Sequence, residues 1–153
     1  MPRTWLALLA LVACNEQAPV TPPATGGRVE LVAAPAAGEL TEYVAQEIAR
    51  GSREQVPIVV YVGATWCEPC RDFHAAVERG ALDAALGPMR FLEFDLDRDG
   101  ARLKAAGYTS DLVPLFARPL ADGRASGTQT DGVRAGGRYV DQLTPRIKAL
   151  FGT

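Results

Sequence analysis

The feature that most constrains the fold is a continuous apolar run at residues 56–62, which leads into a pair of cysteines. The run is rich in β-branched residues and lacks the apolar–polar alternation of a strand with one wet face. It therefore predicts a strand buried on both faces, and such a strand needs helices on both sides of its sheet. Trp66-Cys67-Glu68-Pro69-Cys70 follows, and residues 71–79 have the apolar spacing of a helix. The sequence predicts a strand, a tight turn and a helix, with the cysteines at the turn.

The remaining apolar patterns alternate between strand and helix. Residues 40–48 have helical spacing with Gly51 as the expected C-terminal cap, and residues 91–96 alternate as a strand before a turn at 97–100. A short helix is expected over 101–106, closed by Gly107, and then a strand at 115–117 with a hairpin turn at Asp122-Gly123. The last helix either starts or bends at Pro145. Its apolar stripe is Tyr139, Val140, Leu143, Ile147 and Leu150. This order predicts an α/β fold, a mixed central sheet with helices on both faces.

The N-terminal segment has the pattern of an export signal. After Arg3, an apolar run covers residues 5–13, which is too short for a bilayer-spanning helix of roughly 20 residues. Leu11-Val12-Ala13-Cys14 resembles the lipobox of bacterial lipoproteins. That resemblance implies that residues 1–13 are removed as a signal peptide and that Cys14 becomes the lipidated first residue. An ordinary secretory signal and an uncleaved, tethering helix are the alternatives.

The next segment has the composition of a linker. Residues 14–38 are rich in proline and glycine and predict a flexible tether between the lipid and a single domain at 39–153. Within the tether, residues 28–32 alternate and are a candidate edge strand. An odd number of cysteines in an exported chain calls for a separate role for one of them. Lipidation of Cys14 supplies that role and leaves Cys67 and Cys70 as a pair.

The cysteine pair carries a second resemblance. Trp66-Cys67-Glu68-Pro69-Cys70, after a buried strand and at the start of a helix, resembles the Trp-Cys-x-Pro-Cys redox motif of thioredoxin-like proteins. The match in element order extends over roughly residues 40–151. It implies a thioredoxin-like fold and thiol–disulfide exchange by the redox-active pair Cys67–Cys70, with no other cofactor.

The chemistry of the pair agrees with that resemblance. Two intervening residues on a first helical turn bring the sulfurs of Cys67 and Cys70 within bonding range. Unpaired N–H groups at a helix N-terminus stabilise a thiolate at Cys67, and Pro69 removes an N–H that would otherwise lack a partner. Cys70 lies one turn further, where it can resolve a mixed disulfide. A structural disulfide, two buried thiols or a zinc site are the alternatives. Zinc needs four ligands, and His74 is the one further donor we identify, so we predict no metal site.

Val113-Pro114 provides another match. In the thioredoxin-like family a cis-proline begins the strand that faces the disulfide, and the backbone of the preceding residue pairs with an extended substrate segment. Pro114 stands just before the predicted strand at 115–117. A cis bond costs little at proline, roughly 0.5–1 kcal/mol, and a trans turn proline is the alternative. The resemblance implies that Val113 and Pro114 bind substrate.

The chain departs from the family at the proton acceptor for the deeper thiol. Many thioredoxins carry a buried Asp six residues before the first cysteine, and this chain has Tyr61 there. His74 follows Cys70 by one helical turn and titrates near neutral pH, so it is the first candidate. Glu93 is the second, if its place on the strand turns it toward the same cavity, and Glu68 is a weaker, solvated third. His74 as a packing residue and Glu93 as a surface residue are the alternatives.

These observations predict an extracytoplasmic thiol:disulfide oxidoreductase. Glu68-Pro69 is similar to the reductases of cytochrome c maturation, whereas the residues after Cys70 differ from that group. Trp66 and Pro69 slightly favour a reductase over an oxidase. The expected partners are protein thiols and disulfides, an upstream reductant or oxidant, and a membrane bound through the lipid on Cys14. The alternative is a non-catalytic thioredoxin-fold module that binds a partner protein or a metal.

The charge and length of the chain limit its other partners. A formal charge of −2, with basic residues scattered along the chain, gives no electrostatic reason to expect nucleic acid. One domain of this size is expected to act as a monomer. The lipid would hold the protein in the periplasm or at the outer face of the cell membrane, or in an outer membrane.

Overall fold

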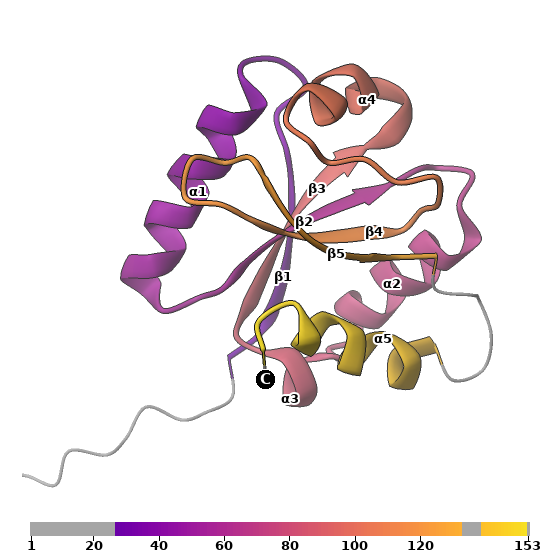
Figure 1. Cartoon of the computed structure of the whole chain (residues 1–153). Helices are drawn as coiled ribbons and strands as arrows, with labels where there is room; N and C mark the ends of the chain where they lie inside the picture. Colours follow the sequence, from indigo (N-terminus) through magenta and orange to yellow (C-terminus); the bar gives the residue numbers. More distant parts are fainter. Residues whose placement is uncertain (1–26, 133–138, 153) are drawn as a thin grey trace, which may run out of the picture.

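A computed structural model describes residues 27–132 and 139–152. Its five strands form one sheet in the order β1-β3-β2-β4-β5 (Figure 1). The strands are β1 (Val29–Ala33), β2 (Ile58–Gly63), β3 (Met89–Asp95), β4 (Leu115–Pro119) and β5 (Ala125–Asp131). The helices are α1 (Leu40–Glu54), α2 (Glu68–Glu78), α3 (Asp83–Leu86), α4 (Leu96–Ala105) and α5 (Tyr139–Ala149).

Strand β2 lies at the centre of a mixed sheet. It pairs in parallel with β3 and antiparallel with β4, while β1 runs parallel to β3 and β5 antiparallel to β4. Every residue of β2 is buried, which confirms the prediction of a strand covered on both faces. The predicted α/β class with a mixed central sheet is therefore confirmed.

Helices cover both faces of this sheet (Figure 1). Alternate residues of β2 divide between two cores, so that Val59 and Tyr61 face one side and Val60 and Val62 the other. Helices α2, α3 and α5 pack on the Tyr61 side, and α1 and α4 pack on the opposite side. The Tyr61 side also carries both domain cysteines, so the redox pair belongs to the core on the α2 face.

Two helix ends differ from the sequence-based expectation. Gly51 lies inside α1, and the helix continues to Gln55. Gln55 adopts the left-handed conformation that glycine usually supplies at a helix C-terminus, and its N–H caps the helix. Residues 97–100, expected as a turn, form the beginning of α4. Asp95 caps that helix by accepting the N–H of Arg98 at 2.9 Å, and acidic residues in the first turn favour its positive end.

The folded part begins earlier than residue 39. The candidate edge strand at 28–32 is real, because β1 pairs with β3 along its length and the N–H of Val29 donates to Asp83 at 2.8 Å. The segment expected to be a tether to residue 38 therefore contributes an edge strand to the domain. The predicted signal peptide at 1–13 and Cys14 lie outside the described residues. No helix within the described ranges is long and apolar enough to cross a membrane.

The C-terminal part follows the predicted pattern in outline. A hairpin at Asp122-Gly123 joins β4 to β5. Helix α5 begins before Pro145, which lies inside it, so the alternative in which the helix starts at that proline is wrong. Leu143, Ile147 and Leu150 are buried, as their spacing predicts. The side chains of Tyr139 and Val140 lie outside the described residues.

Candidate functional site

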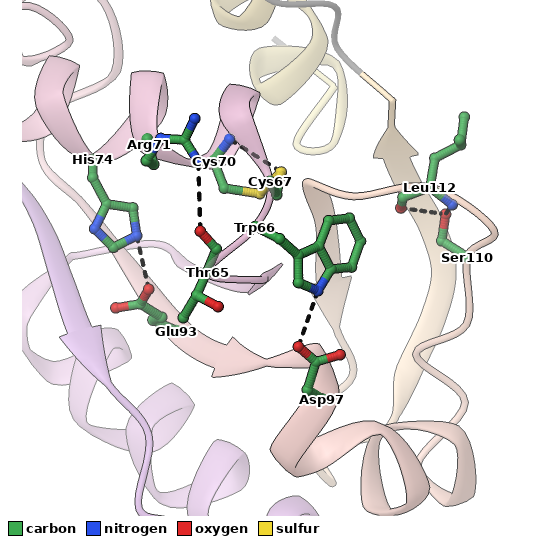
Figure 2. The surroundings of a disulfide bond; sticks show 10 residues. All are labelled: Thr65, Trp66, Cys67, Cys70, Arg71, His74, Glu93, Asp97, Ser110 and Leu112. Carbon is green, nitrogen blue, oxygen red and sulfur yellow. Dashed lines mark hydrogen bonds and ion pairs between the residues drawn. A yellow bond between two sulfur atoms is a disulfide. The ribbon is translucent and has the colours of Figure 1, made fainter.

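Cys67 and Cys70 form a disulfide at the start of α2, after the end of β2. Their Cα atoms are 5.2 Å apart. Cys67 is the N-cap of α2, and its Sγ accepts the N–H of Cys70 at 3.2 Å (Figure 2). Pro69 occupies the first turn, where a missing N–H leaves no carbonyl without its donor. The sulfur of Cys67 therefore lies against the backbone N–H groups at the N-terminus of α2, and these groups favour a thiolate.

Burial alone does not rank the two cysteines. In the disulfide form Cys67 is 4% exposed and Cys70 is 3% exposed. The difference between them is one of position, because Cys67 caps the helix and Cys70 lies inside its first turn. Assignment of Cys67 as the attacking residue therefore rests on the helix N-terminus and stays a prediction.

Trp66, beside the disulfide, and Leu112, in the loop that carries the cis-proline, are large exposed apolar side chains. Trp66 is 61% exposed, and its indole N–H donates to Asp97 at 3.0 Å, which holds the ring over the surface beside Cys67 (Figure 2). Leu112 is 56% exposed and lies in the loop before β4. Sequence reasoning missed Leu112 and Asp97, because their positions depend on segments that are distant in the chain and meet only in the fold.

The predicted cis-proline lies in the same loop. The Val113–Pro114 peptide bond is cis, Pro114 is buried, and Val113 is half-buried in the loop just before β4. Ser110 holds the loop: its hydroxyl donates to the carbonyl of Leu112 at 2.8 Å and accepts the N–H of the same residue at 3.0 Å. The role of Val113 and Pro114 in binding substrate stays a prediction.

His74 and Glu93, considered separately in the sequence, form one ion pair. His74 Nε2 lies 2.7 Å from Glu93 Oε1, and both side chains are about one-third exposed, 36% and 29% (Figure 2). Glu93 stands opposite Tyr61 in the parallel register of β2 and β3, so its side chain points to the α2 face. The hydrogen bond that His74 donates to Glu93 raises the pKa of His74 above its ordinary value. Partial burial opposes this rise, and the charges of Glu93 and Glu78 add to it.

A cavity of about 320 Å³ connects this pair to the redox site. Cys70, His74, Glu93 and Tyr61 all line it. Glu68 is exposed and is not among its lining residues. Two of the three candidate proton acceptors therefore share a cavity with the deeper cysteine, and the third does not.

Tyr61 fills the place where the family's acidic residue is expected. Its ring is fully buried and stacks on Phe116, with ring centroids 5.3 Å apart. It also contacts Phe73 at 4.8 Å and His74 at 5.9 Å between centroids. Tyr61 thus joins the aromatic core of the α2 face to the imidazole of His74.

Among the described residues, no group of three or more His, Cys, Asp or Glu side chains is arranged to hold a metal ion. His74 lies against the carboxylate of Glu93 on a neighbouring strand.

Comparisons with known proteins agree on the fold. No family model matches the chain. A thioredoxin H-type from Chlamydomonas reinhardtii is 40% identical over 70 residues, which is 46% of this chain and 59% of that protein. The chain thus spans a little over half the length of this curated relative.

Two solved structures extend the likeness. Thioredoxin f2 in complex with ferredoxin:thioredoxin reductase is represented by a chain with a TM-score of 0.52 and 19% identity, covering 84% of this chain and 99% of that one. A reduced thioredoxin from Schistosoma mansoni has a TM-score of 0.50 and 18% identity, covering 79% and 98%. The predicted thioredoxin-like fold is therefore confirmed.

Proposed function

We propose that this chain is a thiol:disulfide oxidoreductase that reduces disulfides in other proteins. The observation that carries this proposal is the Cys67–Cys70 disulfide at the first turn of α2, with Cys67 as the helix cap. A disulfide in this place can be opened and re-formed, because the helix N-terminus stabilises the thiolate that attack requires. The thioredoxin fold and the similarity to a thioredoxin H-type support it.

The reaction runs through a mixed disulfide. In the reduced protein, the Cys67 thiolate attacks one sulfur of a substrate disulfide, and the other substrate sulfur leaves as a thiolate. Cys70 then attacks Cys67, which forms the Cys67–Cys70 bond and releases the second substrate sulfur. The protein dithiol is oxidised and the substrate disulfide is reduced, with no further cofactor. An upstream reductant must then restore the dithiol, a role for which the reductase in the thioredoxin f2 complex is a precedent.

The surface beside the disulfide supports a protein substrate. Trp66, next to Cys67, and Leu112, in the loop before the cis-proline, are exposed apolar groups, and the half-buried Val113 packs against the core that contains both cysteines. An extended segment with a cystine can contact these side chains while its sulfur reaches Cys67. The substrates we propose are exported protein thiols, either those of cytochrome c maturation or those of general thiol homeostasis.

The proposed location follows from the N-terminal sequence. Leu11-Val12-Ala13-Cys14 is the basis for lipidation at Cys14 and for attachment to a membrane outside the cytoplasm. One acyl chain binds only marginally, so stable attachment needs more than one chain on that residue. Cys14→Ser is expected to release the protein from the membrane fraction or leave it unprocessed. A variant that stays membrane-bound with unchanged mass would contradict this location.

Insulin reduction tests the activity. With dithiothreitol as the reductant, the full chain is expected to accelerate the precipitation of insulin B chains, measured as turbidity. Cys67→Ser should reduce the rate to that of dithiothreitol alone, while Cys14→Ser, the matched control for loss of a thiol, should keep the full rate. A wild-type chain no faster than dithiothreitol would contradict the activity and favour a binding module.

A further inference from the structure

The proposed reaction contains a proton transfer that the cysteines cannot perform alone. Before Cys70 attacks the mixed disulfide, its thiol must lose a proton, and burial disfavours the charged thiolate. On β2, the side chain that lines the same cavity is the phenol of Tyr61, so this strand places no carboxylate beside Cys70. The acceptor must therefore come from another element that reaches this cavity.

Two elements bring such groups to the cavity. Helix α2 places His74 one turn beyond Cys70, and β3 places Glu93 opposite Tyr61 in the sheet register. The two side chains meet at 2.7 Å, and both line the cavity beside Cys70. A cavity of about 320 Å³ whose lining includes several charged side chains has room for water, which can carry a proton between groups that are not in direct contact.

The pair has a property that neither residue has alone. A carboxylate only accepts hydrogen bonds, so the contact to Nε2 fixes the hydrogen on that nitrogen and leaves Nδ1 as the basic one. An isolated carboxylate, with a pKa of about 4.3, is a weak base for a thiol. Beside Glu93, an imidazole that takes up a proton becomes half of an ion pair, so the carboxylate stabilises the protonated product.

We propose that His74 and Glu93 act as one proton-transfer pair for Cys70, with His74 as the acceptor and Glu93 as its positioning residue. This inference rests on the proposed function. The Cys70 proton passes to His74, the thiolate attacks Cys67, the Cys67–Cys70 bond forms, and the bond from Cys67 to the substrate breaks. The leaving substrate thiolate then takes up the proton that His74 holds, and His74 becomes neutral again. Atoms and charge balance without any external oxidant or reductant in this step.

The pair also limits unfavourable charge. When His74 takes the proton, the two side chains together become neutral as the negative charge appears on Cys70. Without His74, the charge of Glu93 would remain uncompensated in the cavity where the thiolate forms, and like charges oppose ionisation. The other charged or titratable groups facing His74 come from α2, β2, β3 and the region of β1. On α2 these are Arg71 and Glu78, on β2 Tyr61, and on β3 Asp95. In the region of β1 they are Arg28 and Glu30.

Rapid mixing with dithiodipyridine separates the two thiol reactions. The reduced full chain, carrying Cys14→Ser so that only two thiols react, releases one thiopyridone when Cys67 attacks and a second when Cys70 resolves the mixed disulfide. The second phase is intramolecular, so its rate is independent of reagent concentration. The variants are His74→Gln and Glu93→Gln, with Glu78→Gln as the matched control for a carboxylate near His74 that forms no ion pair with it.

The two phases should respond differently. We expect the first phase to change by less than about twofold in all variants, and the second phase to slow roughly a hundredfold in His74→Gln, at the low end of the range for a positioned general base. Glu93→Gln should slow the second phase about tenfold, and Glu78→Gln less than about twofold. In the wild type the second-phase rate rises with pH through the pKa of His74. Glu93→Gln should move that rise to lower pH, and His74→Gln should abolish it.

Other outcomes overturn specific parts of the account. A second phase slowed less than about threefold by both substitutions would contradict the proton-transfer pair. Slowing by only one of the two would contradict their joint action. A wild-type chain that releases a single thiopyridone would contradict the proposed function itself, because Cys70 would not be resolving the mixed disulfide.

Discussion

Strand β3 carries two ion-pair sites that resemble each other in geometry and differ in what they can do. Arg90 Nε lies 2.8 Å from Glu30 and Arg90 Nη2 lies 2.9 Å from Glu54. Further along the strand, Glu93 meets His74 at 2.7 Å. Because Arg90 and Glu93 are an odd number of positions apart, their side chains leave opposite faces of the sheet.

The difference lies in the cation and in its neighbours. A guanidinium stays charged at every pH at which proteins fold, and Arg90 is not among the residues that line the cavity beside Cys70. An imidazole gains and loses a proton near neutral pH, and His74 does line that cavity. An ion pair can assist a reaction when one partner titrates in the working range and shares a space with the reacting group. The Arg90 site should therefore matter for stability and the His74 pair for turnover.

The largest expected effect on stability is at Arg90, whose side chain is 8% exposed. Arg90→Met removes the cation that Glu30 and Glu54 share. It also removes the contact of 3.8 Å between Arg90 and Glu47. We expect the free energy of unfolding to fall by about 2 kcal/mol, less than for a fully buried pair because two partners are partly exposed. Urea denaturation measures this change. An Arg90→Met chain of unchanged stability, or one whose second thiopyridone phase is slowed, would contradict the comparison.

A smaller effect is expected from the matched carboxylates. Glu54→Gln weakens the Arg90 site and should lower the free energy of unfolding by about 0.5 kcal/mol, since Glu54 is 44% exposed. It should leave the second thiopyridone phase unchanged. Glu93→Gln should do the reverse, with the phase slowed and stability nearly kept. Equal effects of the two substitutions on either measurement would remove the distinction between the sites.

The smallest expected effect is the pH dependence of stability. Because the pKa of His74 is raised in the folded protein, its protonated form contributes stability that is complete below the unfolded pKa of about 6.5. This contribution is lost as pH rises through the folded pKa. The difference in unfolding free energy between wild type and His74→Gln should be below about 1 kcal/mol at about pH 5.5, and absent at about pH 8.5. The Arg90→Met difference should remain at both pH values. A His74→Gln difference that grows with pH would have the wrong sign.

Local sequence patterns predicted most of the fold. The apolar run of β2 predicted a strand buried on both faces, and the spacing in residues 28–32 predicted an edge strand. The errors were at element ends. Gly51 was expected to cap α1, yet helix packing carries the chain past it to Gln55. Residues 97–100 were expected to be a turn, because the capping role of Asp95 depends on backbone geometry that the pattern does not show.

The site was predictable where its parts are adjacent in sequence and obscure where they are not. The Cys67–Cys70 disulfide and the cis bond before Pro114 agree with the expectation. His74 and Glu93 were identified as separate candidates, since sheet register and helix packing together decide that they meet. The hydrogen bond from Trp66 to Asp97 joins the loop before α2 to the first turn of α4, and no periodic pattern connects these segments.

The most direct test of the account is to trap the mixed disulfide with insulin. Cys70→Ala, in a chain carrying Cys14→Ser, can attack a substrate disulfide and cannot resolve the product. We predict that this variant accumulates an insulin adduct on Cys67 that dithiothreitol releases, seen by mass spectrometry and on non-reducing gels. The matched Cys67→Ala chain should form no more adduct than a chain lacking all three thiols. Adducts on Cys70 of the Cys67→Ala chain, in equal or greater yield, would contradict Cys67 as the attacking residue.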